Sequence, residues 1–302
     1  MGTSDIRFNI VIGKGGVGKT LVSILNGMHS AMQGKKTLIC ELNTNESIAQ
    51  KLGSPRSNGK LVEVSENLWV VNIRPEEALM EYANLKLGLP SVSKLVFGNP
   101  LVSALTDFIP GMTDLLMIGK AFNHERERNH ANQPIWDQVI IDAPATGHGL
   151  TFLKLPSVIA QAIPSGNMHN EAQLMHGLIA DPLRTRIDVV TIPEPLPIRE
   201  TIELHAQLQK EQNLTIGRLI INRYPGRLLS DAQWKTLSEM PVPQDPAGKW
   251  LVEEESYARS VDAVLADLNM IKYPTIKLPE VHGLSFGQMQ QEDINLLLEG
   301  YR

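Results

Sequence analysis

Residues Gly13–Thr20 read Gly-Lys-Gly-Gly-Val-Gly-Lys-Thr, and this stretch decides the fold that the chain adopts. The apolar run Ile6–Ile12 precedes it, and a helical pattern over Leu21–Gln33 follows it. Strand, glycine loop and helix in this order form the context of a phosphate-binding loop. Glycines permit a tight turn that aims backbone N–H groups at phosphate oxygens, and the helix N-terminus adds a positive dipole end. A plain glycine turn is the disfavoured alternative.

The side chains of this motif predict a site for ATP or ADP together with Mg²⁺. Lys19 would reach the β- and γ-phosphates, and the Thr20 hydroxyl would coordinate the metal. Asp142 ends the strand pattern Trp136–Ile141 and is the acidic residue expected to hold Mg²⁺, usually through water. A helix cap is the competing interpretation of Asp142. The remaining loop residues would form the phosphate cradle: Gly13, Gly15, Gly16, Val17 and Gly18.

Composition excludes several classes of protein. The chain has 302 residues, 42% of them hydrophobic, which is enough for one large α/β domain with an insertion. A net charge of −5 with acidic and basic residues intermixed gives no sign of nucleic-acid binding. Cys40 is the single cysteine, so a disulfide framework is excluded. Because neither a membrane-spanning run nor a signal peptide is recognisable, we expect a cytoplasmic protein without an integral membrane segment.

Strand patterns alternate with helical patterns along the chain, which predicts an α/β fold with a mostly parallel sheet covered by helices on both sides. Besides the first strand and Trp136–Ile141, the expected strands are Lys36–Leu42, Leu61–Val64, Leu68–Ile73, Ile187–Ile192, Leu219–Asn222 and Thr275–Leu278. Further helices are expected before Gly53, over Leu150–Val158, Glu171–Ile179, Ile198–Gln212, Ala232–Leu237 and Glu255–Asn269, and at the C-terminus. The whole chain, residues 1–302, is expected to be a single P-loop ATPase domain.

Residues 75–130 look like an inserted helical subdomain, to which residues 150–182 would contribute. Helical patterns occur there without strand signals, separated by glycine and proline. The expected helices are Pro75–Leu87, Ser91–Phe97, Leu101–Phe108 and Met112–Arg128.

Lys14 is not required by the ordinary phosphate loop, because Lys19 already serves the phosphates. Lys-Gly-Gly-Val-Gly-Lys-Thr resembles the deviant Walker A motif of P-loop NTPases similar to MinD, ParA, the nitrogenase iron protein and the arsenite-pump ATPase. The resemblance implies a dimer in which Lys14 reaches the nucleotide of the other subunit. A surface lysine is the simpler alternative.

Among these families, the chain most resembles the arsenite-pump and tail-anchored-protein targeting ATPases, in a short single-copy form. The segment Asp142–His148 matches their Asp, small residues and Thr-Gly-His. His148 itself would orient water, or simply pack or cap. The stretch Ile192–Thr201, which ends in Glu-Thr, also resembles the family, as do Leu219–Arg223 and Leu278–Gly283. The resemblance implies that Asn222, Pro279 and Glu280 contact the adenine, although Asn222 alone would more readily be a strand-end cap.

Several departures from the family pattern affect the expected chemistry. Where the family carries the Asp that positions the attacking water, this chain has Asn43. An amide cannot accept a proton as a carboxylate does, so hydrolysis is expected to be weak unless Glu41 or Glu46 substitutes. The cysteines that bind arsenite, zinc or an iron–sulfur cluster in relatives are missing, so neither zinc nor such a cluster is expected.

Apolar residues of the helical segments suggest a hydrophobic protein client, or simply the core of the subdomain itself. Targeting ATPases bind a membrane helix in a groove of this region, and flexible methionines suit varied partners. The residues that would line it are Leu79, Met80, Leu85, Leu89, Leu95, Val96, Phe97, Leu101, Leu105, Phe108, Ile109, Met112, Leu115, Met117, Met168, Leu174, Met175 and Leu178.

The sequence therefore favours a dimeric ATPase switch that couples ATP binding and hydrolysis to a protein-handling or membrane-related task. Lys14, Asn43 and Asp142 are its candidate catalytic residues, and either a homodimer or a heterodimer with a related subunit would complete the site. The second hypothesis is a catalytically weak nucleotide-binding subunit that acts as partner of a related ATPase. A small-molecule P-loop enzyme of the dethiobiotin synthetase type is disfavoured by Lys14 and by the helical insertion.

Overall fold

The strands of the computed structural model form an eight-stranded sheet in the order β3-β4-β2-β5-β1-β6-β7-β8. The structure describes residues 6–42, 46–75, 77–78, 112–144, 149–210, 214, 216–241, 243–281 and 291–301. Within these ranges β3 runs antiparallel to β4 and the other pairs are parallel. The predicted, mostly parallel sheet is therefore confirmed. The strands are β1 Phe8–Gly13, β2 Thr37–Glu41, β3 Val62–Ser65, β4 Leu68–Asn72, β5 Gln138–Asp142, β6 Thr185–Thr191, β7 Ile216–Tyr224 and β8 Thr275–Pro279.

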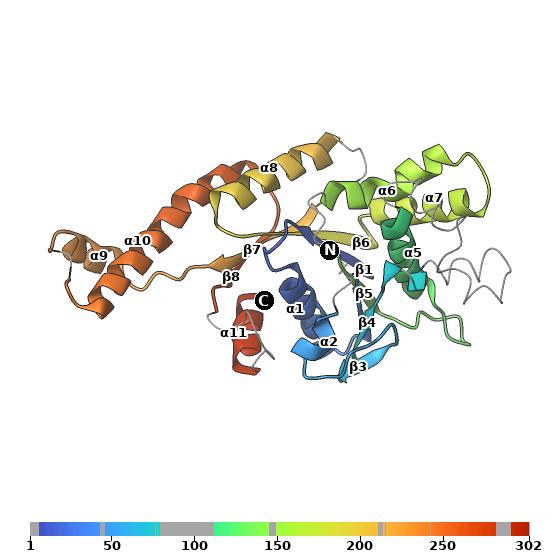
Figure 1. Ribbon diagram of the computed structural model, residues 1–302, viewed down its shortest axis with the longest axis horizontal. Helices are drawn as coiled ribbons and strands as arrows, with labels where there is room; N and C mark the ends of the chain where they lie inside the picture. The colour runs from blue at the N-terminus through green and yellow to red at the C-terminus, as the bar shows by residue number, and fades with distance from the viewer. Residues whose placement is uncertain are drawn as a thin grey trace, which may run out of the picture.

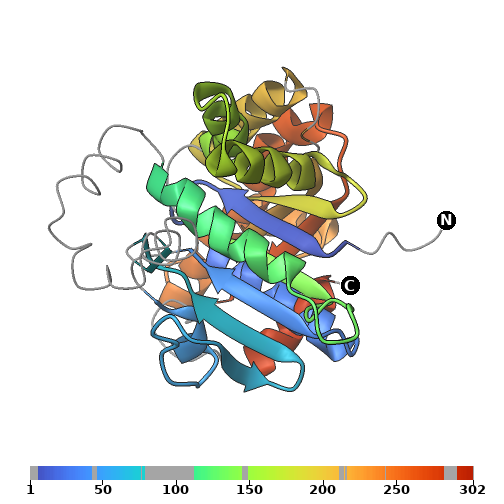
Figure 2. The ribbon, with the colours of Figure 1, turned by 90° about the vertical axis from the view of Figure 1, so that its right-hand side faces the viewer.

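Helices cover both faces of the sheet, as predicted. In Figure 1, α6 to α8 lie above the central strands and α5 lies to their right, whereas α1 and α11 lie below them. Residues of α1, α2 and α11 pack in one core and residues of α5 to α8 in the other. Figure 2 shows α5 crossing in front of the sheet. The helices are α1 Lys19–Met32, α2 Ile48–Lys51, α5 Met112–Arg126, α6 Gly149–Ala162, α7 Asn167–Ala180, α8 Pro195–Lys210, α9 Asp231–Ser238, α10 Pro246–Ala266 and α11 Gln291–Tyr301, with a 3₁₀ turn η2 at Asp267–Met270.

Two hydrophobic cores lie on the two faces of the sheet, and the central strand β1 contributes to both. Phe8, Ile10 and Ile12 belong to the core under α5 to α8, whereas Val11 belongs to the core under α1 and α11. Side chains of a strand point alternately to opposite faces, so a strand buried on both sides is apolar at successive positions. This explains the consecutive apolar residues Ile10–Ile12 of β1 and Val139–Ile141 of β5.

The parallel register brings several strand ends to one edge of the sheet. Asp142 at the end of β5 pairs with Glu41 at the end of β2 and with Val11 of β1. The glycine loop leaves β1 at this same edge and enters α1. Open parallel sheets bind ligands at the carboxyl ends of their strands, so the fold places the loop and Asp142 where such a site belongs.

The predicted helix Met112–Arg128 corresponds to α5, Met112–Arg126. Leu115 and Met117 of this helix are buried in the core, as are Met175 and Leu178 of α7. Leu174 is half exposed, and Met168 packs against the core. The other three predicted helices of the inserted segment lie almost entirely outside the described residues, and so do the candidate groove residues between Leu79 and Ile109. No described helix is both long and apolar enough to cross a bilayer.

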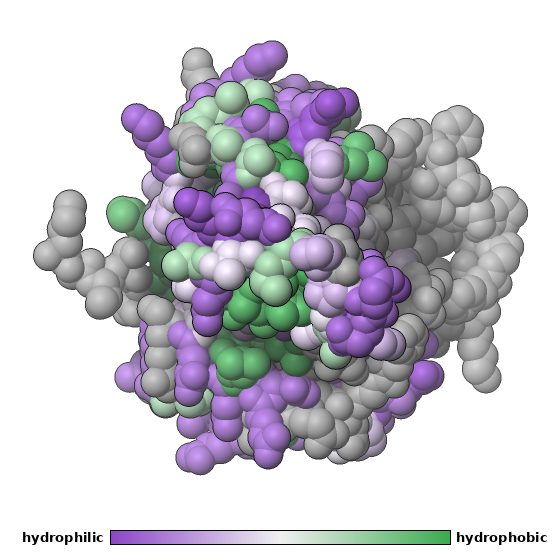
Figure 3. Space-filling model, turned by 90° about the vertical axis from the view of Figure 1, so that its left-hand side faces the viewer, coloured by the Kyte–Doolittle hydropathy of each residue, from purple (hydrophilic) through white to green (hydrophobic). Residues whose placement is uncertain are grey.

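The expectation that a helix begins near Glu255 was wrong, because α10 begins at Pro246. The Asp245 carboxylate accepts a hydrogen bond from the Gly248 N–H at 2.8 Å, and proline occupies the first helical turn, where it loses no hydrogen bond. The proline-rich passage thus starts the helix. The first turns of α10 form with α9 an arm that extends from the sheet (Figure 1), and Trp250 on it is 53% exposed. Apolar surface also shows between hydrophilic side chains at this end of the molecule (Figure 3).

A buried ion-pair network fastens the C-terminal helix to the sheet. Arg218 of β7 donates hydrogen bonds to both oxygens of Asp188 on β6, at 3.0 and 2.5 Å, and to the Tyr301 hydroxyl at 2.6 Å. The Nδ2 groups of Asn9 and Asn26 each donate to the same carboxylate at 3.0 Å. Burial alone would raise the pKa of Asp188, but the nearby arginines outweigh it and hold the pKa below its ordinary value.

We predict that Asp188→Ala lowers the free energy of unfolding by about 3–5 kcal/mol, because it leaves a partly buried guanidinium without its counter-charge. The matched control is Asp231→Ala, which removes an exposed carboxylate paired with Arg227 and Arg259 and should leave the free energy of unfolding nearly unchanged. Urea unfolding followed by circular dichroism measures both. If both substitutions lowered the free energy of unfolding equally, Asp188 would not be the central carboxylate of the network.

Candidate functional site

The glycine loop is packed closely against the neighbouring strands at two points. A Cβ atom on Gly13 would lie 2.4 Å from the Val190 carbonyl oxygen of β6. At Gly18, where φ is +98°, a Cβ atom would lie 2.2 Å from the Asn222 Nδ2 of β7. No side chain fits either position without moving its neighbours. Between them, Gly15 and Gly16 have no neighbouring atom within 4 Å of such a Cβ, so this part of the loop is open.

Lys19 begins α1 and its ammonium group turns back onto the loop. The Nζ atom donates a hydrogen bond to the Lys14 carbonyl oxygen at 3.0 Å. The side chain is buried, and burial lowers its pKa while Asp142 nearby acts in the opposite direction. A largely desolvated ammonium that lies against the loop backbone is suited to bind a phosphate anion, because its charge is weakly screened there.

Asp142 lies beside Thr20, as the motif predicts. The Thr20 hydroxyl donates to Oδ2 of Asp142 at 2.8 Å, and the Ser23 hydroxyl donates to Oδ1 at 3.1 Å. Burial raises the pKa of Asp142 to about 6, although both hydroxyls and Lys19 oppose the shift. Sequence reasoning missed Ser23, which stands three residues after Thr20 and therefore on the same face of α1.

These groups fit Mg²⁺. The metal prefers oxygen donors and keeps several waters, so one hydroxyl and one carboxylate beside bound phosphates form a suitable donor set. Thr20 and Asp142 supply that set from two different elements at hydrogen-bond distance. Clusters of three or more His, Cys, Asp or Glu do not occur among the described residues.

The predicted adenine contacts lie at the ends of β7 and β8. Asn222 is buried, and its Nδ2 donates to the Val17 carbonyl oxygen at 2.9 Å, so its amide braces the glycine loop directly. Pro279 pairs with Tyr224 across the two strands, and the Glu280 N–H donates to the Tyr224 carbonyl oxygen at 3.1 Å. The structure therefore brings all three residues to the edge of the sheet that carries the loop. Their contact with a base remains a prediction.

Lys14 points to α8 of its own chain. Its Nζ lies 2.6 Å from Oε1 of Glu200, on the second turn of that helix. The Glu-Thr pair at 200 and 201 was singled out in the sequence, but its contact with the loop was not foreseen. The partners are 186 residues apart, and only the strand order of the sheet brings them together.

Both candidate substitutes for the missing aspartate are engaged elsewhere. Glu41 accepts hydrogen bonds from the backbone and hydroxyl of Ser47 at 2.8 and 2.9 Å, and from the Ile48 N–H at 3.3 Å. Burial raises the pKa of Glu41 to about 7, against the effect of these hydrogen bonds. Glu46 accepts from the backbone of Ser57 and Asn58. The two carboxylates thus hold α2 and the following loop, while Asn43 and His148 lie outside the described residues.

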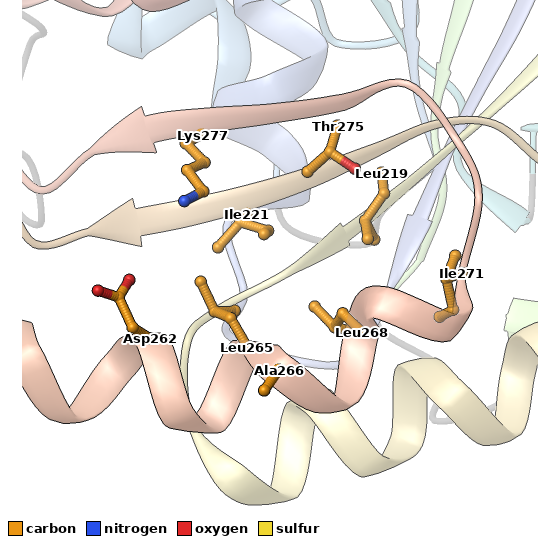
Figure 4. A pocket seen from close by; sticks show the side chains of 9 residues that line it. All are labelled: Leu219, Ile221, Asp262, Leu265, Ala266, Leu268, Ile271, Thr275 and Lys277. Atoms are coloured by element: carbon orange, nitrogen blue, oxygen red, sulfur yellow. The ribbon is translucent and has the colours of Figure 1, made fainter.

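A separate cavity of about 400 Å³ opens between β7, β8 and α10 (Figure 4). Leu219 and Ile221 of β7 line it, whereas Asn222, the next residue, turns to the glycine loop. Because successive side chains of a strand face opposite sides, this cavity and the glycine loop lie on opposite faces of β7. The cavity is therefore not part of the predicted nucleotide site.

Sequence comparison agrees with the geometry. Residues 6–175 match the anion-transporting ATPase (ArsA) family. The chain belongs to this family. Its relatives include the ATPase BagA of Mycobacterium tuberculosis, 24% identical over 99% of this chain and 95% of the relative. A putative arsenical pump-driving ATPase of Aquifex aeolicus is 22% identical over 92% and 76%, respectively. The ATPase GET3 of Kluyveromyces lactis is 33% identical over 53% and 48%. The predicted family is confirmed.

We predict that Asp142→Asn stabilises the protein in metal-free buffer at pH 7.5 by about 2 kcal/mol. A carboxylate whose pKa rises to about 6 on folding favours the folded state only when protonated. Its contribution is thus lost as the pH rises from about 4 toward 6, and the neutral amide escapes this loss. The free energy of unfolding, measured by urea denaturation at pH 5 and pH 7.5, tests this prediction. The exposed Asp137, changed to Asn, is the surface control.

The gap in stability between Asp142→Asn and the native protein should narrow at the lower pH. A variant less stable than the native protein at both pH values would contradict the assignment of Asp142 as a desolvated carboxylate.

Proposed function

We propose that this member of the anion-transporting ATPase family is a Mg²⁺-dependent dimeric switch that couples ATP binding and hydrolysis to a protein-handling or membrane-related task. The observation that carries the proposal is the 2.8 Å contact between Thr20 and the buried carboxylate of Asp142, beside the ammonium of Lys19. A hydroxyl, a carboxylate and a desolvated cation at the mouth of a glycine loop match the requirements of a nucleoside triphosphate with its metal.

Each residue of the site has a distinct role in this proposal. The backbone of Gly13–Thr20 cradles the phosphates and Lys19 neutralises their charge. Thr20 and Asp142 hold Mg²⁺, which when bound would offset charge on the β- and γ-phosphate oxygens. Lys14 serves the nucleotide of the other subunit, and Asn222, Pro279 and Glu280 contact the adenine. No zinc or iron–sulfur cluster takes part.

The task is proposed from the family and from the helical segments. Relatives named GET3 and an arsenical pump-driving ATPase are similar in sequence to this chain. A hydrophobic protein segment is the client class that fits the apolar sequence between Leu79 and Ile109. We expect the protein to act in the cytoplasm and to bind no nucleic acid.

The alternative function is a catalytically weak nucleotide-binding subunit that acts as the interaction partner of a related ATPase in a heterodimer. Asn43 favours this alternative, since it replaces the carboxylate that positions water in the family. The engagement of Glu41 and Glu46 in backbone hydrogen bonds adds support, because neither carboxylate is free to take over.

We predict that Lys19→Ala abolishes ATP binding, while Asn43→Asp raises turnover about 100-fold without changing ATP affinity. The first change removes the buried cation that faces the phosphates, and the second restores a general base. Isothermal calorimetry with MgATP measures binding, and phosphate release measures turnover.

Lys249→Ala, on the arm, is the matched control for the loss of a lysine and should bind ATP normally. If Lys19→Ala binds ATP as the native protein does, the nucleotide site is refuted. High turnover of the native chain alone would refute the weak-subunit alternative, whereas turnover that appears only with a related subunit would support it.

A further inference from the structure

The loop lysine Lys14 and the α8 glutamate Glu200 form an ion pair that conflicts with the role proposed for Lys14. The Nζ atom lies 2.6 Å from Glu200 Oε1 of the same chain. To reach a phosphate held by another subunit, the ammonium group would have to move away from the α8 helix that carries Glu200. The contact with Glu200 and the contact with that phosphate are therefore competing positions of one side chain.

Glu200 has no other partner in the described part of the chain. Its second carboxylate oxygen, Oε2, is buried without a hydrogen-bond donor there. When one oxygen of a buried carboxylate lacks a hydrogen-bond donor, the stability of its ionised form rests largely on the cation at the other oxygen. Glu200 thus depends on Lys14 as its counter-charge among the described residues.

Lys14 is, in contrast, free to leave. Its side chain is 45% exposed, and the neighbouring Gly15 and Gly16 have open space around them. Its carbonyl oxygen accepts the hydrogen bond from Lys19 at 3.0 Å. A phosphate bound in the loop would compete with this carbonyl for the Lys19 ammonium and so release the backbone that carries Lys14.

We propose that Glu200 is an inhibitory partner of Lys14, and that this intrasubunit ion pair must open before Lys14 reaches the phosphates of a paired subunit. The proposal rests on the proposed function, because it concerns the regulation of the same nucleotide site. Phosphate bound to the loop loosens the contact through Lys19, and the phosphates of the second subunit then replace Glu200 as the counter-charge. The ion pair thereby couples pairing of subunits to the presence of nucleotide.

Glu200→Gln tests the proposal, since it keeps the size of the side chain and removes its charge. The ATP-dependent association of the subunits, measured by sedimentation velocity over a range of protein concentrations, should then need about two- to fivefold less protein. The matched control is Glu203→Gln, an exposed acid on the same helix, which should leave association unchanged. Both variants must bind MgATP as tightly as the native chain.

A second measurement needs neither nucleotide nor association. Acetylation of Lys14 by acetic anhydride, which transfers an acetyl group to Nζ and releases acetate, is followed by mass spectrometry. It should be about two- to fivefold faster in Glu200→Gln than in the native chain, with the exposed Lys249 as the internal reference. Equal Lys14 labelling in both chains would show that the ion pair does not form, and would overturn the proposal.

The outcomes separate this proposal from the proposed function. Association that occurs with ATP but is unchanged or weakened by Glu200→Gln overturns the inhibitory role and leaves the dimeric ATPase intact. If no variant associates although all bind ATP, the dimeric use of Lys14 fails and the inhibitory role fails with it. Loss of ATP binding in the native chain refutes the nucleotide site itself.

Discussion

The hydrogen bond from Thr20 to Asp142 is the interaction on which the rest of the site depends. It joins residues 122 positions apart, one on the first turn of α1 and one at the end of β5. The contact forms only because β1 and β5 are parallel neighbours, with Val11 beside Asp142 in register. A shift of this register by one residue would turn the carboxylate to the other face of the sheet. The parallel pairing of the central strands is therefore what places Thr20 and Asp142, the predicted metal-binding pair, together at the loop.

Two equally buried aspartates, Asp188 and Asp142, have different neighbours, and their pKa values are shifted in opposite directions. Asp188 lies between arginines and amides, and its pKa stays below the ordinary value. Asp142 is just as buried, but receives hydroxyl groups and a lysine shared with the loop, and its pKa rises to about 6. When the protein does not replace the hydration that a buried carboxylate has lost, a bound cation stabilises the ionised form of that carboxylate most strongly. The contrast fits the predicted metal-binding role of Asp142, whereas Asp188 joins β6, β7 and α11 through Arg218.

The local parts of the fold were predictable from sequence, and the long-range contacts of the loop were not. Strand, loop and helix around Gly13–Thr20 follow from apolar period and glycine spacing, and Asp142 follows from its place after an apolar strand. The start of α10 is also encoded locally, by the cap Asp245 before Pro246, but the prolines around it favour a linker when the sequence is read alone. The contacts of Asn222 with Val17 and of Glu200 with Lys14 depend on strand order, which no local pattern encodes.

The two halves of the glycine loop differ in how tightly they pack against the rest of the protein. Gly18 packs so closely against Asn222 that a single added carbon would overlap the amide, and the Val17 carbonyl accepts a hydrogen bond from that amide. The side toward α8 has open space at Gly15 and Gly16, and only a partly exposed ion pair spans the gap from Lys14 to Glu200. Close packing resists displacement, whereas a solvated ion pair exchanges readily with another anion. We therefore expect any movement of the loop on phosphate binding to occur at Lys14–Gly16, the half of the loop that carries the ion pair with Glu200.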